Sequence, residues 1–360
     1  MLRDMMLPLM LAAALLAPQP SPPEDAYDVV RFADGVYGFV WREQPFHPEP
    51  NVLIVINDED VLVVDSSMLP STARTIIGEI RKLTPKPVRY LVNTHWHDDH
   101  VFGNGVFRDQ WPGLQVISHV NTRIDAAEKA FGAIKTDLEN NKATLAKYEE
   151  FLRTGKGSDG TALTEERRRR VEAVVRMLTK YGEEVPHLRE SLPDLTFNRS
   201  LTLQAGSRTI RIEHLGRGNT RGDVVVYLPA EKIVASGDLV VAPVPFGIGS
   251  YYAEWADTLA KLQQLEASTI LIGHGAVQHD WSAAARVQRP LTDLVARVKA
   301  GIAAGATLEA VQKTVTLDDW KKELAGDDPL AQRAFDAYFV QPAVERAYRQ
   351  AKGEPLAISQ

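Results

Sequence analysis

The chain has 360 residues, of which 44% are hydrophobic and 24% are charged. This composition is typical of a globular protein, and the length allows one large domain or a domain with an appendage. The formal net charge of −6 argues against a nucleic-acid partner, which would require a broad basic surface. The chain contains no cysteine, so disulfide bonds and thiolate metal ligands are both excluded.

The first residues have the pattern of an export signal. Arg3 is followed by an apolar run over residues 5–17, which is too short to span a bilayer. This pattern predicts a signal peptide at residues 1–17, a periplasmic or secreted protein and no stable membrane insertion, with an N-terminal anchor helix as the alternative. Prolines at positions 18, 20, 22 and 23 predict an extended linker over residues 18–26.

Alternating strands and helices are predicted next. Apolar runs at residues 52–56 and 61–64 flank a turn-forming stretch and predict a β-hairpin. Residues 71–83 have helical spacing, with Ile76, Ile77 and Ile80 on one face, and prolines at 85 and 87 end this helix. Residues 88–92 then predict a further strand. The alternation favours an α/β sandwich.

The most informative stretch follows this strand and reads His95-Trp96-His97-Asp98-Asp99-His100. A turn that leaves a β-strand can direct His95 and His97 at one ion, while Asp99 and His100 point at a second. Imidazole nitrogens and carboxylate oxygens together suit zinc best, with iron and manganese as substitutes. A solvated loop with chance histidines is the alternative, but this cluster is far more specific than a lone histidine.

Residues 121–194 differ in character and predict an inserted helical hairpin. Apolar residues recur every seven positions and predict one long helix with a coiled-coil-like seam at Ile124, Phe131, Leu138, Leu145 and Leu152. Glycines at 155, 157 and 160 end this helix, and Thr164 is expected to cap a second one. The hairpin could cover the metal cleft, or it could form a homo-oligomer contact.

The stretch from His95 to His100 is similar to the signature of the metallo-β-lactamase superfamily. Further matches follow in the expected order: Asp65 at the end of an apolar run, then residues 216–223, 236–238 and 273–275. The resemblance covers about residues 29–280. It implies an αββα sandwich domain at residues 27–280 with the hairpin inserted at 121–194. Helical spacing after Trp281 predicts a C-terminal helical appendage at residues 281–360.

The resemblance also implies a set of metal ligands, with two zinc ions expected and one possible. Carried over residue by residue, the set is His95, His97 and Asn219 for the first ion, Asp99, His100 and His274 for the second, and Asp238 as a bridge, as in the glyoxalase-II-like members.

Asn219 departs from the family pattern, which usually has histidine at this position. A neutral amide oxygen is a weaker donor than imidazole, so the first site should bind its ion less tightly or complete its shell with water. His214 is a possible substitute, although alternation along its strand does not place its side chain at the metal. His119 is expected to support the site or the core. Asp65 is expected to hydrogen-bond a ligand imidazole and fix its tautomer.

These features predict a hydrolase that acts on a small-molecule ester, thioester, lactone or amide. A metal ion lowers the pKa of a bound water to about 7 and polarises a carbonyl group. Asp99 is the predicted catalytic residue, because it can accept a hydrogen bond from that water. Aromatic residues predicted near the cleft favour an apolar substrate; they are Trp96, Phe246 and Tyr251 as substrate contacts, with Phe102, Tyr252 and Trp255 in similar positions.

Three alternatives stay open. The first is β-lactamase activity, which needs a cation for the substrate carboxylate; Asp238 is followed by Leu239 rather than lysine, but Arg217 or Arg221 could serve. The second is a mononuclear iron enzyme that oxidises sulfur compounds, in which the histidine replaced here by Asn219 is an iron ligand. The third is a non-catalytic protein that binds metal weakly.

Overall fold

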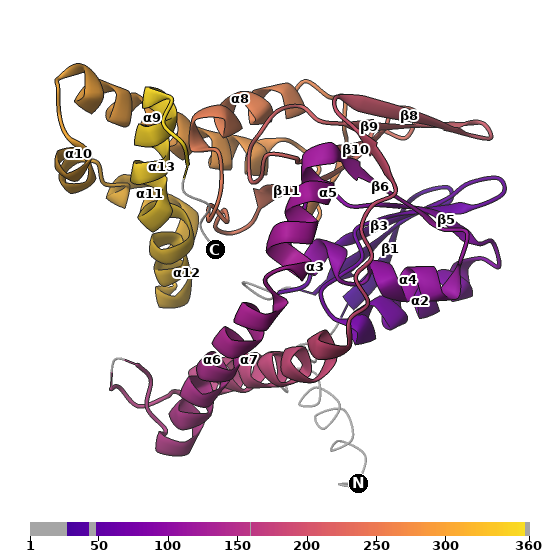
Figure 1. Cartoon of the computed structure of the whole chain (residues 1–360), viewed down its shortest axis with the longest axis horizontal. Helices are drawn as coiled ribbons and strands as arrows, with labels where there is room; N and C mark the ends of the chain where they lie inside the picture. Colours follow the sequence, from indigo (N-terminus) through magenta and orange to yellow (C-terminus); the bar gives the residue numbers. More distant parts are fainter. Residues whose placement is uncertain (1–26, 43–47, 159, 357–360) are drawn as a thin grey trace, which may run out of the picture.

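The computed structural model describes residues 27–42, 48–158 and 160–356, so the predicted signal peptide and proline-rich linker lie outside the described residues. Two β-sheets face each other at the centre, and helices cover both outer sides (Figure 1). Within the described ranges, no helix combines the length and the apolar character needed to cross a bilayer.

The first sheet has seven strands in chain order, antiparallel at its beginning and parallel from β4 onward. Its strands are β1 (Tyr27–Ala33), β2 (Val36–Trp41), β3 (Val52–Ile56), β4 (Val61–Val64), β5 (Val88–Val92), β6 (Gln115–His119) and β7 (Leu195–Phe197).

The second sheet has five strands in the order β12-β11-β10-β9-β8, and only the β11–β12 pair is parallel. Its strands are β8 (Ser200–Ala205), β9 (Arg208–Glu213), β10 (Val225–Leu228), β11 (Ile233–Val241) and β12 (Thr269–His274).

The main core fills the space between the two sheets. Val64 and Val92 of the first sheet pack in one buried cluster with Val226 and Leu271 of the second. Each such side chain contributes about 1.5–3 kcal/mol when it is fully buried. Successive residues of these strands face opposite sides: Leu53 and Val55 of β3 lie in this cluster, whereas Val52 and Ile54 pack against the outer helices.

Helices cover the outer faces of both sheets. On the first sheet, α2 (Pro70–Leu83) and α4 (Asn104–Gln110) bury Ile76, Ile80 and Phe107. On the second sheet, α8 (Tyr252–Leu262) and α9 (Ser282–Ala303) bury Trp255 and Leu291. The predicted αββα sandwich is confirmed by these four layers. The buried positions of Trp255 and of Phe102 and Tyr252, all 0% exposed, correct their assignment to the cleft rim.

The hairpin is interrupted near its start, contrary to the prediction of one long helix. α5 (Val120–Asp125) leads into the π-helical η1 (Ala126–Phe131), and α6 (Ile134–Thr154) begins only after a turn at Gly132. A Cβ at Gly132 would lie 2.4 Å from the Glu128 carbonyl oxygen. Ile124 of the predicted seam is exposed.

The second helix of the hairpin, α7 (Glu165–Glu184), packs against α6, and both project from the sandwich (Figure 1). Thr164 caps it, since its Oγ1 accepts a hydrogen bond from Arg167 N at 3.2 Å. At the base of the hairpin, Tyr181 packs in a buried cluster with Val101 and Phe102. These two residues directly follow the histidine stretch, so the hairpin base supports that loop.

The C-terminal helices extend the core of the second sheet. Phe335 and Phe339 are fully buried in the same apolar cluster as Trp255 and Leu259 of α8. The elements are α10 (Leu308–Thr314), α11 (Asp318–Ala325), α12 (Pro329–Ala334), the π-helical η3 (Phe335–Val340) and α13 (Gln341–Lys352).

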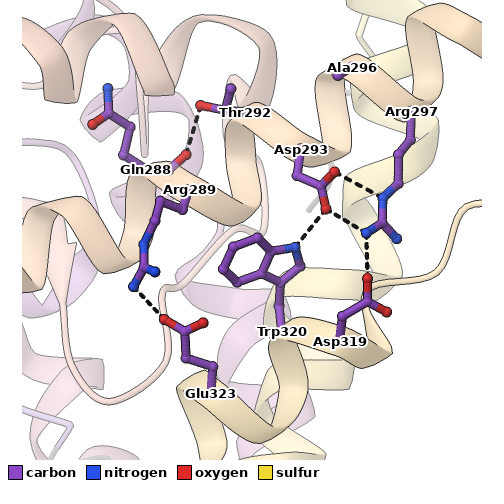
Figure 2. Close-up of a pocket in the computed structure, with 9 residues that line it drawn as sticks. All are labelled: Gln288, Arg289, Thr292, Asp293, Ala296, Arg297, Asp319, Trp320 and Glu323. Carbon is purple, nitrogen blue, oxygen red and sulfur yellow. Dashed lines mark hydrogen bonds and ion pairs between the residues drawn. The ribbon is translucent and has the colours of Figure 1, made fainter.

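A cavity of about 640 Å³ lies between α9 and α11 of this appendage (Figure 2). Its charged side chains pair with one another: Arg289 with Glu323, and Arg297 with both Asp293 and Asp319. None of the residues that line it is a candidate metal ligand.

Candidate metal centre

The candidate site lies where strands of both sheets end. β5 delivers the loop with His95 and His97, and the short helix α3 (Asp98–Val101) follows directly. Asp238 lies within β11, and His274 ends the parallel neighbour β12. Val224 N donates to the Thr94 carbonyl oxygen at 2.9 Å and so joins the histidine loop to the second sheet.

Two glycines leave room for the close contacts at this site. Gly237 has a φ of 51°, and a Cβ there would lie 2.6 Å from Thr94 Cβ. A Cβ at Gly273 would lie 1.9 Å from Asp238 Oδ1. The histidine loop and the Asp238 carboxylate could not occupy these positions if either glycine carried a side chain.

One group of donor atoms forms around His95. Its Nε2 lies 2.8 Å from His97 Nδ1 and 3.8 Å from Asp238 Oδ2. His95 and Asp238 are buried, whereas His97 is partly exposed.

A second group forms around Asp99. Its Oδ2 lies 3.2 Å from His100 Nε2 and 3.0 Å from His274 Nε2. The Asp238 Oδ1 atom lies 3.4 Å and 3.7 Å from the same two nitrogens. The two oxygens of Asp238 thus face different histidines, an arrangement that can bridge two ions. His100 is fully buried, while Asp99 and His274 are about one-seventh exposed, so solvent reaches the centre from their side.

Two buried atoms of these groups, together with the side-chain oxygen of Asn219, have no hydrogen-bond partner among the residues that the structure describes. They are His100 Nε2, Asp238 Oδ1 and Asn219 Oδ1. Buried polar atoms are nearly always paired, so unpaired atoms on His100 and Asp238 fit a cation site. The combination of imidazole nitrogens with carboxylate and amide oxygens fits zinc.

Asn219 is 1% exposed and is linked to this centre through Phe246. Its Nδ2 donates to the Phe246 carbonyl oxygen at 2.6 Å, which leaves Oδ1 as the unpaired atom. The Phe246 ring is 5.5 Å from the His97 ring. His214 lies in a separate pair, because its Nδ1 donates to the Asp223 carbonyl oxygen at 2.8 Å and its ring centroid is 4.2 Å from that of His119.

Asp65 orients His100. Its Oδ2 lies 2.8 Å from His100 Nδ1, and it also accepts hydrogen bonds from Thr94 N and Thr94 Oγ1, both at 2.8 Å. A carboxylate on Nδ1 places the proton there and leaves Nε2 as the atom that can bind metal.

Burial and neighbouring charges set the protonation of the cluster. Burial lowers the pKa of His97 to about 4 and the pKa of His95 well below its usual value, so both imidazoles are neutral at pH 7. Burial also acts to lower the pKa of His100, but the Asp99 and Asp65 carboxylates outweigh it and raise the pKa. Metal binding requires neutral imidazoles and ionised carboxylates, and a bound cation would take over the role of the His100 proton.

Aromatic rings stand beside His97. The Trp96 ring is 4.6 Å from the His97 ring, and Phe246 stands on another side of it. Tyr338 of η3 is 42% exposed, and its ring is 5.5 Å from that of Phe246. The sequence analysis missed Tyr338, because nothing local connects residue 338 with the histidine loop. The predicted contact Tyr251 instead carries the Arg217 guanidinium on its face at 4.5 Å.

Comparisons with known proteins agree with this architecture. The family described as the metallo-beta-lactamase superfamily matches residues 47–274, and the chain belongs to this superfamily. Two solved structures have the same fold: a metallo-beta-lactamase from Pontibacter korlensis and the mono-zinc form of the metallo-beta-lactamase FIM-1 from Pseudomonas aeruginosa.

The Pontibacter korlensis protein is 21% identical with a TM-score of 0.53, covering 74% of this chain and 100% of that one. FIM-1 is 17% identical with a TM-score of 0.52, covering 76% of this chain and 98% of that one. Among curated proteins, the linear primary-alkylsulfatase of Pseudomonas sp. (strain ATCC 19151) is 24% identical over 224 residues. That match covers 60% of this chain and only 40% of the alkylsulfatase.

Proposed function

We propose that this protein is a zinc-dependent hydrolase of a small-molecule ester, thioester, lactone or amide. The observation that supports the proposal is the convergence of six histidine and aspartate side chains, two of them with an unpaired buried atom, at one edge of the sandwich. Membership of the superfamily agrees with metal-dependent hydrolysis.

Each candidate residue has a proposed role at the metal centre. The first ion would be held by His95, His97 and Asn219, the second by Asp99, His100 and His274, and Asp238 would bridge them. When bound, zinc would supply Lewis-acid activation of water and of the bond to be cleaved. Asp99 stands at the exposed side of the centre, where its carboxylate can accept a hydrogen bond from the attacking water and orient it.

The proposed substrate carries an apolar group next to the bond that is cleaved. Trp96, Phe246 and Tyr338 offer apolar surface beside His97. β-Lactam hydrolysis is less well supported, because the cations that could bind the substrate carboxylate are already paired. Arg221 makes a bidentate ion pair with Asp125, and Arg217 does so with Glu254.

A sulfate ester with an alkyl chain is the second candidate substrate. The similarity to the linear primary-alkylsulfatase favours it, and the aromatic surface beside His97 would suit an alkyl chain. We also propose export to the periplasm or secretion, which rests on the apolar run at residues 5–17.

The experiment that tests this function is turnover after controlled zinc loading. The full chain is stripped with a chelator, reloaded with zinc and assayed with aryl esters, thioesters, lactones, a β-lactam and alkyl sulfates. We expect zinc-dependent turnover of at least one ester-type substrate. Asp99→Ala should abolish that turnover and preserve the fold, whereas Asp109→Ala, at an exposed ion pair with Arg189, should leave it unchanged.

Two results would count against the proposal. Unchanged turnover in Asp99→Ala would remove the role assigned to this carboxylate. Failure of the zinc-loaded protein to hydrolyse any of the substrates would favour a non-catalytic metal-binding protein.

A further inference from the structure

The loop at residues 246–251, here called the Phe246 loop, holds Asn219 at several points. The Phe246 carbonyl oxygen accepts from Asn219 Nδ2 at 2.6 Å, and Ser250 Oγ donates to the Asn219 carbonyl oxygen at 3.0 Å. Tyr251 N also donates to the neighbouring Gly218 carbonyl oxygen at 2.7 Å. Both the side chain and the main chain at position 219 therefore depend on where this loop lies.

The C-terminal appendage in turn holds the Phe246 loop. Arg346 of α13 is 8% exposed and donates from Nε to the Ser250 carbonyl oxygen at 2.7 Å and from Nη2 to the Gly249 carbonyl oxygen at 2.6 Å. At the other end of the loop, Gly247 N donates to the Tyr338 carbonyl oxygen at 2.9 Å. A buried guanidinium is costly unless it is hydrogen-bonded, so these contacts favour a single position of the loop.

The orientation of the Asn219 side-chain amide decides whether Asn219 can bind a metal ion. An amide group can present either oxygen or nitrogen in a given direction, and only oxygen can bind a cation. The bond from Nδ2 to the Phe246 carbonyl oxygen selects the orientation in which Oδ1 is left unpaired. An amide is also a weaker donor than the imidazole usual at this position, so its affinity for metal depends strongly on being held in advance.

We propose that Arg346 is a positioning residue for the metal centre: by fixing the Phe246 loop from the last helix, it holds the Asn219 amide with Oδ1 toward the metal site. The proposal rests on the proposed function, because it assumes that Asn219 contributes to a metal site. It also gives the appendage a role in the chemistry of the sandwich domain, from about 100 residues further along the chain than the loop.

The test is zinc affinity, measured by competition with a fluorescent chelator on the full chain. Arg346→Lys keeps the charge but cannot reach both carbonyl oxygens in the geometry of the guanidinium. We expect it to lower the zinc affinity of the weaker of the two sites about 10-fold. A loss of this size is typical when a residue that supports a metal ligand is changed. Arg349→Lys, on the same helix but ion-paired at the surface with Glu345, is the matched control and should change nothing.

A double-mutant cycle separates positioning from general destabilisation. In an Asn219→Ala background the amide is absent, so Arg346→Lys should cause little further loss of zinc affinity. An equal loss in both backgrounds would overturn the proposal.

If Arg346→Lys does not fold, as judged by its melting temperature, Ser250→Ala provides the second variant. It removes one contact between the Phe246 loop and Asn219 and should also lower the zinc affinity. An unchanged zinc affinity would overturn the proposal.

The outcomes also distinguish this inference from the function on which it rests. If the parent protein binds no zinc, both are overturned. If the parent binds zinc and Arg346→Lys binds it equally well, only the role of Arg346 is overturned.

Discussion

Asp238 shows how single residues define the centre. Its two oxygens face different histidines. Glycine is the only residue type that leaves room for Oδ1 at position 273 of the neighbouring strand. Asp65 acts indirectly, because its hydrogen bond with His100 Nδ1 leaves Nε2 as the nitrogen that can bind metal. The resemblance to the superfamily predicts these roles, whereas the atom that each group presents is visible only in the structure.

His119 gives a prediction that is independent of metal. Burial, together with the nearby His214 imidazole, lowers its pKa from 6.5 to about 4. Between these pH values the unfolded chain binds a proton that the folded chain does not, so stability is lost as the pH falls. The difference corresponds to about 3 kcal/mol, at 1.36 kcal/mol per unit of pKa.

The substitution His119→Asn should remove this contribution. Asparagine can replace the cap that His119 Nδ1 provides to Asn121 N but does not titrate. Chemical denaturation at pH 7 and pH 4 should show a smaller loss of unfolding free energy in the variant than in the parent. Equal losses in both proteins would contradict the assignment.

At the scale of elements, the ends of strands and the turns between them determine the site. β5 directs the histidine loop toward β11, and Gly237 allows the contact with Thr94. The same principle explains what the sequence could not show. The heptad pattern predicted a continuous helix through Gly132, but the α-helix gives way to a π-helix at Ala126 and to a turn at Gly132 before α6 begins.

Gly237→Ala tests this contact between the sheets. The added methyl group would lie 2.6 Å from Thr94 at a positive φ, so we expect a loss of about 1–3 kcal/mol in unfolding free energy. Gly78→Ala in α2 is the control, since nothing lies within 4 Å of its Cβ position and helix propensity favours alanine. A variant at position 237 as stable as the parent would show that the histidine loop adapts.

Tyr338 of η3 provides a prediction about substrate. If it contacts the apolar part of the substrate beside Phe246, Tyr338→Ala should raise KM for aryl or alkyl esters by about 10-fold, equivalent to about 1.4 kcal/mol of lost contact. kcat should change little, because Tyr338 is not one of the proposed metal ligands. Tyr338→Phe keeps the ring and should behave like the parent; a KM unchanged in Tyr338→Ala would remove Tyr338 from the substrate site.

At the scale of the whole molecule, the helical hairpin and the C-terminal appendage both pack against the sandwich domain. The motifs and their order predicted the αββα fold and six residues that the structure brings together at one place. Tyr338 and Arg346 escaped prediction, because their contacts with the Phe246 loop join segments about 90 residues apart or more, and no local pattern encodes such pairings. Phe102, Tyr252 and Trp255 were placed at the rim because hydropathy alone does not distinguish an apolar rim from the core.

The helical hairpin is the other feature that concerns the whole molecule. It projects from the sandwich, while its base packs against the loop that follows the histidines (Figure 1). A homo-oligomer formed through the hairpin stays a prediction. Sedimentation of the full chain at several concentrations would test it.

The central claim is that the clustered histidines, carboxylates and Asn219 bind metal. Zinc content of the purified full chain, determined by elemental mass spectrometry beside Asp238→Ala and Asn219→His, tests it most directly. We predict two zinc ions per chain in the parent, tighter retention of zinc in Asn219→His and a clear loss in Asp238→Ala. A parent protein without zinc after loading, or equal zinc content in the parent and Asp238→Ala, would contradict the account.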